Sequence, residues 1–264
     1  MITINPLAHS GMKKRSSHFL LSGMLILTVC IGLSNAAVAQ QNSEYRITVV
    51  PTFPLSKQIF LTTYVGYVNN PGTKIISYYI GAPFIVTYKP NEVVELMGGA
   101  FLIINKDKLG SNSREFRPLA GVKLTLPNTH NLHIFNWARY EYRSFHYDDK
   151  SLNNVKNRIR NRVAIEFPLS KNAWQPKSWY GFSDFEFFYT FEKGYLDRFR
   201  QRFGAGYVLN KQWKAEFIYH IQLVKSSKDL NPVWTDNIFR INMKWAIPNK
   251  KLKVHHNDQL DMDE

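Results

Sequence analysis

The sequence predicts an all-β protein, a single antiparallel transmembrane β-barrel of about ten strands (eight to twelve) with a charged lumen. Three observations predict it. Strand-length segments carry charge on alternate residues, the chain begins with a secretory signal, and no later segment reaches the ~20 apolar residues of a membrane helix. Successive side chains of a strand point to opposite faces, so each segment has one charged face and one apolar face. In a soluble sandwich the charged face would be solvated and the apolar face would form the core, whereas in an outer-membrane barrel the charge faces inward and the apolar face meets lipid.

The amino terminus has the three parts of a secretory signal peptide. Residues 13–15 are Lys-Lys-Arg, residues 19–33 form a largely apolar run, and residues 37–39 are Ala-Val-Ala. This order of basic, apolar and small residues predicts a signal peptide over residues 1–39. A membrane anchor is disfavoured, because the run is short for a spanning helix and ends at a cleavage pattern. Cys30, the only cysteine, lies in this segment, so the mature chain is expected to have no disulfide.

Ten later segments read as strands. They are residues 57–68, 75–89, 93–105, 114–126, 131–145, 157–168, 179–191, 198–209, 212–224 and 237–247. Most reach or exceed the 9–11 residues, roughly, with which a tilted strand crosses a bilayer. We therefore expect a barrel over residues 57–247, preceded by a periplasmic segment at 40–56 and followed by a polar periplasmic tail at 248–264. Residues 44–50 fit either an extra strand or part of that periplasmic segment.

The connections between these segments alternate in character. Residues 89–92, 126–129 and 210–211 are tight turns rich in Pro and Asn, whereas 106–112, 146–156 and 225–236 are longer and polar. Short periplasmic turns and long external loops are typical of outer-membrane barrels. The exception is 168–178, a longer connection on the side predicted to be short. An even number of strands also predicts that both termini are periplasmic.

Parity assigns faces in the second half of the chain. The predicted inner face carries a lattice of alternating charge, whose members are Arg139, Glu141, Arg143, Arg158, Arg160, Arg162, Asp184, Glu186, Arg198, Arg200, Arg202 and Glu216. Neighbouring strands bring opposite charges close enough to pair, and we expect the three arginines at 158–162 to neighbour Asp184 and Glu186. The segments 75–89 and 93–105 are apolar on both faces, so parity assigns them no side.

Two roles for this lattice stay open. The first is structural, since a small barrel must fill its interior and an Arg–Glu lattice can do so. The second is functional, because surplus arginine can line a narrow pore or pocket that binds or passes small anions. Trp and Tyr near the strand ends predict an aromatic girdle at the membrane interface. These residues are Tyr67, Tyr88, Trp179, Tyr180, Tyr207, Trp213, Trp234 and Trp245.

Other classes of function find little support. The formal charge is +14, yet the basic residues are spread over separate strands and no nucleic-acid-binding motif is present, so no nucleic-acid partner is expected. Parity places His220 inward and Ser144 and Ser183 outward, so a Ser–His hydrolase is not indicated and we expect no enzyme. No metal or cofactor motif is found, and the expected cofactor set is empty.

The order of several pieces resembles a known family. These are Trp-Ala-Arg-Tyr-Glu-Tyr-Arg at 137–143, Asn-Arg-Ile-Arg-Asn-Arg at 157–162, Asp-Phe-Glu-Phe-Phe at 184–188 and Asp-Arg-Phe-Arg-Gln-Arg-Phe-Gly-Ala-Gly-Tyr at 197–207. They resemble a bacterial family of outer-membrane barrels, the domain-of-unknown-function family twenty-four ninety, over about residues 135–245. The resemblance implies a single barrel in the outer membrane and no established activity. The chain departs from simple outer-membrane barrels where 248–264 follows the aromatic segment 239–245.

The sequence thus favours an outer-membrane barrel with a structural or permeability role, in contact with outer-membrane lipid and open to small anionic solutes. Two alternatives remain. A soluble periplasmic lipocalin-like barrel would bind a ligand inside an apolar interior and carry its charge outside. A lipid- or lipopolysaccharide-modifying enzyme would depend on a residue such as His220 or Glu186. The oligomeric state is not predicted.

Overall fold

The described part of the chain is almost entirely β-structure. The computed structural model describes residues 42–71, 75–79, 84–107, 112–127, 132–172 and 174–249. The predicted signal peptide and most of the predicted tail lie outside these residues. The elements are β1 (Asn42–Pro54), β2 (Ile59–Thr63), β3 (Val65–Asn70), β4 (Ile75–Tyr79), β5 (Phe84–Tyr88), β6 (Val94–Asp107), β7 (Ser113–Thr125), β8 (His133–Tyr147), the 3-10 helix η1 (Lys150–Leu152), β9 (Asn154–Pro168), β10 (Ser178–Thr190), β11 (Tyr195–Val208), β12 (Trp213–Val224) and β13 (Val233–Ala246). In this part of the chain no helix has the length and apolarity needed to span a bilayer.

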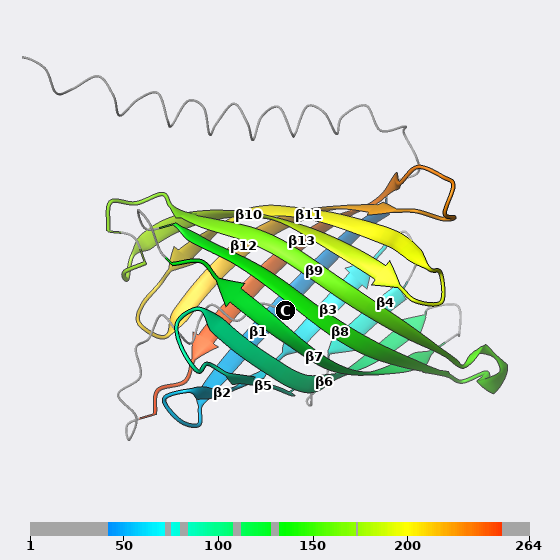
Figure 1. Cartoon of the computed structure of the whole chain (residues 1–264), viewed down its shortest axis with the longest axis horizontal. Coiled ribbons are helices and arrows are strands. Elements are labelled where there is room, and N and C mark those ends of the chain that lie inside the picture. Colours follow the sequence, from blue (N-terminus) through cyan, green and yellow to red (C-terminus); the bar gives the residue numbers. More distant parts are fainter. Residues whose placement is uncertain are drawn as a thin grey trace, which may run out of the picture. The chain divides into compact units, whose positions relative to one another are not determined.

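The strands close into one barrel (Figure 1). From β6 to β13 each strand pairs antiparallel with the next. β2 and β3 both pair with β1, and β4 and β5 both pair with β6, so each of these couples occupies one position around the barrel. The described strands therefore fill eleven positions. This confirms the predicted barrel class and lies within the predicted range of eight to twelve.

The eleventh position is β1, which closes the barrel by pairing parallel with β13. The register runs from Asn42 opposite Asp236 to Thr52 opposite Ala246. The sheet is therefore mixed, and the prediction of a purely antiparallel barrel is wrong at this seam. The assignment of residues 40–56 to a segment outside the barrel is also wrong. Residues 42–54 alternate like the other barrel strands, which is why they fit into the wall. Thr48 and Thr52 are buried inward, while the apolar Ile47 is exposed outward.

Because the number of strand positions is odd, the first strand starts at one end of the barrel and the last strand finishes at the other. We call the end with connections 148–153, 191–194 and 225–232 the loop end, and the opposite end, with 169–177 and 209–212, the turn end. Because β1 runs parallel to β13, β1 starts at the loop end and β13 finishes at the turn end. The predicted even number of strands is therefore wrong for the described barrel, and the predicted placement of the two chain termini concerns residues outside the described ranges.

The barrel is polar inside and apolar outside over its second half. Glu141 is fully buried and Arg162 is 1% exposed, whereas the outward Phe217 is 66% exposed. The faces that parity assigned to β7 through β13 agree with this burial pattern. Inward charge and outward apolar side chains reverse the arrangement of a soluble β-protein, in which apolar side chains fill the core.

The first half of the barrel interior is lined differently. An apolar cluster from β1, β5, β6, β7 and the residue between β2 and β3 lies inside, and its members are Val50, Tyr64, Ile85, Phe101, Ile103 and Leu119. Strands of this half thus carry large apolar side chains on the inner face as well as on the outer face. Parity assigned no side to the segments 75–89 and 93–105, because both faces of these segments carry apolar side chains.

The parallel seam predicts a specific cross-link. Ile47 and Ile241 lie directly opposite each other across β1 and β13, so the double variant Ile47→Cys/Ile241→Cys should cross-link on mild oxidation or with a short bis-maleimide. The measurement is a shift in gel mobility on cross-linking. Reducing agent should reverse the shift of the disulfide form, and protease cleavage should identify the bis-maleimide form.

The matched control is Tyr67→Cys/Ile241→Cys. Tyr67 faces Ile47 on β3, one strand further from β13. If β1 lay outside the barrel, β3 would be the neighbour of β13 and this control pair would react instead.

Candidate functional site: the charged lumen

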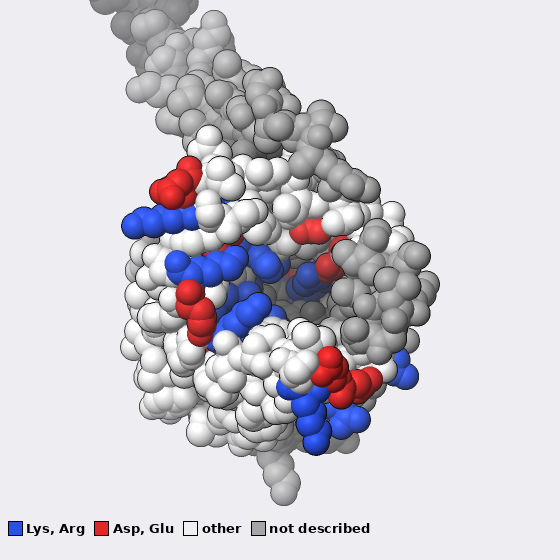
Figure 2. All heavy atoms as spheres, turned by 90° about the vertical axis from the view of Figure 1, so that its right-hand side faces the viewer, with Lys and Arg blue, Asp and Glu red and all other residues white. Residues whose placement is uncertain are grey.

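The charged side chains gather inside the second half of the barrel. All twelve residues of the predicted lattice lie on the inner face of β8 to β12. Viewed from the loop end, Lys and Arg side chains line a hollow that leads into the barrel (Figure 2). The lumen is therefore the place where the fold concentrates its ionisable groups.

Glu141 on β8 is the most heavily shared carboxylate of the lattice. Its Oε1 accepts from Arg139 Nε at 2.7 Å and from Arg160 Nη1 at 3.0 Å, and its Oε2 accepts from Arg158 Nε at 2.9 Å. The carboxylate is fully buried. Three guanidinium groups around one carboxylate can be tolerated in a closed interior only if other acids balance the remaining charge.

Glu186 and Asp184 on β10 supply part of that balance. Glu186 accepts from Arg160 Nε at 2.9 Å and from Arg200 Nη1 at 3.3 Å. Asp184 binds Arg202 with both carboxylate oxygens, accepting from Nε at Oδ1 at 2.8 Å and from Nη2 at Oδ2 at 2.6 Å. Two-point pairing of this kind fixes the orientation of the guanidinium as well as its position.

The pairing differs in detail from the predicted one. Of the three arginines on β9, only Arg160 contacts an acid of β10, and it does so diagonally, because its directly opposite residue is Phe188. Arg158 turns the other way, to Glu141 on β8. Arg162 has no hydrogen-bond partner among the described residues. Long side chains reach diagonal neighbours, so strand order alone does not determine the partners.

A second carboxylate cluster lies between β7 and β8 near the loop end. Glu115 accepts from Arg117 Nε at 2.7 Å, and from Arg143 Nε at 2.6 Å and Arg143 Nη2 at 3.0 Å. The predicted site included Arg143 but omitted Glu115 and Arg117. Their parity on β7 had already placed them inward, so the signal was present in the sequence.

A third cluster surrounds Glu216 near the turn end. Its Oε1 accepts from the Tyr180 hydroxyl at 2.6 Å and pairs with Lys244 Nζ at 2.8 Å. Tyr180 was predicted to belong to an interfacial girdle, but it lies in the lumen and is 2% exposed. Gly206 makes room for it, because a Cβ there would lie 2.1 Å from the Tyr180 ring.

The long connection at the turn end folds into the lumen. Trp174, in connection 169–177, is 9% exposed, stacks on His133 with ring centroids 4.2 Å apart and packs on Tyr180 at 5.0 Å. Its φ of 64° is unusual for a bulky residue. This connection was the exception to the predicted short turns. Its length lets an aromatic side chain cover the turn end of the charged cavity.

Basic side chains outnumber acidic ones on the inner face of the described residues. Nine basic and eight acidic side chains are buried. The partly buried inward side chains add more basic groups than acidic ones, and these are Arg46, Lys89, Arg117, Arg143, Arg198 and Arg200 against Glu44 and Asp236. The lumen therefore carries a positive surplus.

Two further chemistries can be checked in the described residues. His220 is fully buried, and neither of its ring nitrogens has a hydrogen-bond partner there, so no Ser–His pair forms around it. No cluster of three or more His, Cys, Asp or Glu side chains in these ranges could hold a metal ion.

Comparison with known proteins gives one match. A family model described as "Protein of unknown function (DUF2490)" matches residues 77–232. These residues run from β4 to the connection before β13 and include every member of the predicted lattice. No curated protein and no solved structure matches the chain.

The shared carboxylates predict a large effect of removing Arg160. Arg160→Ala would take a cation from both Glu141 and Glu186 and leave buried negative charge less compensated. We expect a loss of about 3–5 kcal/mol in the free energy of unfolding, measured in a denaturant titration.

Arg114→Ala is the matched control, because Arg114 lies on β7 with its side chain exposed, and we expect a change of no more than about 0.5 kcal/mol. Unchanged stability of Arg160→Ala together with altered anion permeability would contradict a structural lattice and favour a pore.

Proposed function

The chain belongs to this family of unknown function, and from the barrel itself we propose that it is a bacterial outer-membrane protein whose arginine-rich lumen binds or passes small anions. The observation that carries the proposal is the reversed polarity of the barrel. Ion pairs fill the second half of the interior, while large apolar side chains cover the outside. Water would penalise such an exterior, whereas lipid would not.

The apolar exterior extends around the barrel. Exposed apolar side chains include Ile47 on β1, Leu96 on β6, Phe116 on β7, Val163 on β9 and Phe217 on β12. A lipocalin-like barrel needs the opposite arrangement, with polar side chains outside. The charged inner face of β8 to β13 therefore favours the membrane barrel over that alternative.

Aromatic pairs at the turn end support the same reading. Trp179 on β10 packs on Tyr207 of β11 with centroids 4.8 Å apart, and Trp213 on β12 stacks on Trp245 of β13 at 5.1 Å. These four residues lie on adjacent strands at the same end of the barrel. Trp and Tyr favour the membrane–water interface, so a band of this kind suits the rim of a membrane barrel.

The positive surplus of the lumen supports the anion part of the proposal. Arg198 lies near the loop end of β11, and its Nε has no hydrogen-bond partner among the described residues. Arg200 follows it on the same face of β11, and Phe188 lies opposite it on β10. The central carbon of the Arg198 guanidinium is 5.8 Å from the centroid of the Phe188 ring. Cations that line a narrow passage lower the free energy of an anion there and raise that of a cation.

Cell fractionation tests the membrane part. We expect the mature protein in the outer-membrane fraction, with a gel mobility in detergent that changes on heating, as a closed barrel unfolds only when heated. A protein recovered in the soluble periplasmic fraction would contradict the proposal and direct the search to a ligand of the apolar half of the interior.

Conductance in planar bilayers tests the anion part. Under a salt gradient we expect a reversal potential on the anion-selective side for the wild type, and a shift toward cation selectivity for Arg198→Glu. Arg114→Glu makes the same charge change on the exposed outer face and should leave the selectivity unchanged. No conductance, or equal shifts in both variants, would count against anion passage.

A further inference from the structure

Arg162 differs from the other buried arginines of the lattice. Arg139, Arg158, Arg160 and Arg202 each donate to a carboxylate. Arg162 is 1% exposed, yet its Nε, Nη1 and Nη2 all lack a hydrogen-bond partner among the described residues. A buried cation without a counter-charge is strongly unfavourable. This position therefore calls for an acceptor that carries negative charge.

The nearest acid in the register is already occupied. Glu186 lies directly opposite Arg162 on β10, but its two oxygens accept from Arg160 and Arg200. On the other side Arg162 lies opposite Trp137 of β8, and its guanidinium stands 4.2 Å from the ring centroid. Stacking on an aromatic face stabilises the cation but satisfies none of its N–H donors.

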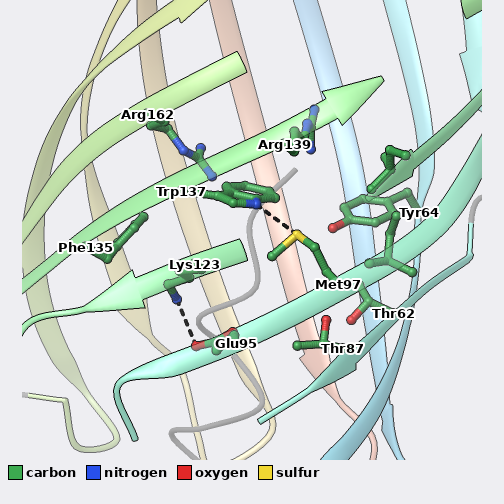
Figure 3. A pocket seen from close by; sticks show the side chains of 12 residues that line it. Thr62, Tyr64, Thr87, Glu95, Met97, Lys123, Phe135, Trp137, Arg139 and Arg162 are labelled. Carbon is green, nitrogen blue, oxygen red and sulfur yellow. Dashed lines mark hydrogen bonds and ion pairs between the residues drawn. The ribbon is translucent and has the colours of Figure 1, made fainter. Parts of the chain in front are cut away.

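The Arg162 guanidinium borders a small cavity in the turn half of the lumen (Figure 3). The cavity has a volume of about 20 Å³ and is lined by side chains of the apolar half together with Trp137, Arg139 and Arg162. Its polar rim includes Thr87, whose hydroxyl is buried and has no hydrogen-bond partner among the described residues. A cavity of this size holds a single atom or a water-sized molecule.

The charges around the cavity favour an anion. Glu95 is the one acid among the lining residues, and its Oε1 faces two lysines, Lys89 at 3.2 Å and Lys123 at 3.3 Å. Arg162 and Arg139 add further positive charge on the opposite wall, on either side of the Trp137 ring. The lining residues that the structure describes are therefore net positive.

We propose that this cavity is a binding site for a small monovalent anion of about the size of chloride, held by the guanidinium of Arg162, which itself stacks on the face of Trp137. An anion supplies both the hydrogen-bond acceptor and the counter-charge, whereas a water molecule supplies only the acceptor. The small volume favours a monatomic anion over phosphate or a longer carboxylate. The proposal names the site of the anion binding proposed above, and it rests on that function only in placing the anion in the lumen.

Thermal unfolding of the purified, folded barrel tests the site. The midpoint is compared in sodium chloride and in sodium gluconate at equal ionic strength, since gluconate is too large for the cavity. Chloride should raise the midpoint of the wild type by roughly 5–10 °C when its concentration is about a hundred times the dissociation constant. Arg114→Gln, on the exposed face, should behave as the wild type does.

Arg162→Gln should show no rise of the unfolding midpoint in chloride, so its stability relative to the wild type should depend on which salt is present. In gluconate it should unfold at the same temperature as the wild type or above it, because it removes a buried uncompensated charge. In chloride it should unfold below the wild type. A wild type that does not distinguish chloride from gluconate, or a variant that keeps the full difference, would overturn the site.

A second measurement does not depend on the variant folding. Crystals of the wild type grown with bromide in place of chloride should show an anomalous peak beside the Arg162 guanidinium, and its absence would overturn the proposal. Both experiments are independent of location and conductance. Binding without conductance would preserve the site and reject anion passage, and conductance without binding would do the reverse.

Discussion

The closed barrel depends on how its buried carboxylates are shared. Glu141, Glu186 and Glu115 each accept from two or three guanidinium groups, and together they link the neighbouring strands from β7 to β11 along the inner wall. A guanidinium buried beside no acid is costly, and a carboxylate buried beside no cation is equally so. The interior of the second half can therefore be polar only because the register of neighbouring strands brings these groups together. The outer face is then left to apolar side chains.

The two halves of the interior follow different physical rules. The first half is filled by an apolar cluster around Phe101 and Leu119, which needs only volume and shape. The second half is filled by charge and needs correct pairing as well. The Arg162 cavity lies where these halves meet, between the apolar residues of β5 to β7 and the charged residues of β8 and β9. At such a boundary a guanidinium can be enclosed beside an acid that is already paired with other cations.

The seam between β1 and β13 shows how a single strand changes the topology. With β1 included in the barrel wall, the number of strand positions is odd. The pair that closes the barrel, β1 with β13, is therefore parallel, and β1 starts at the loop end. The alternation in β1 fits the pleat as well as that of any other strand. Local pattern could identify this strand, but it carried no information about its partner. That partner is 190 residues or more away in the chain, for example Ile47 opposite Ile241.

The sequence by itself determined the fold class, the family, and the faces of β7 to β13, because charge at a period of two records which side of a strand is buried. It also placed all twelve lattice residues on the inner face. The tertiary structure alone decided which of them pair, that Tyr180 and Trp174 lie in the lumen, and that Arg162 has no hydrogen-bond partner among the described residues. The physical reason is distance along the chain. Alternation is local, whereas partners, closure and cavities depend on register, twist and side-chain reach between segments that the sequence separates.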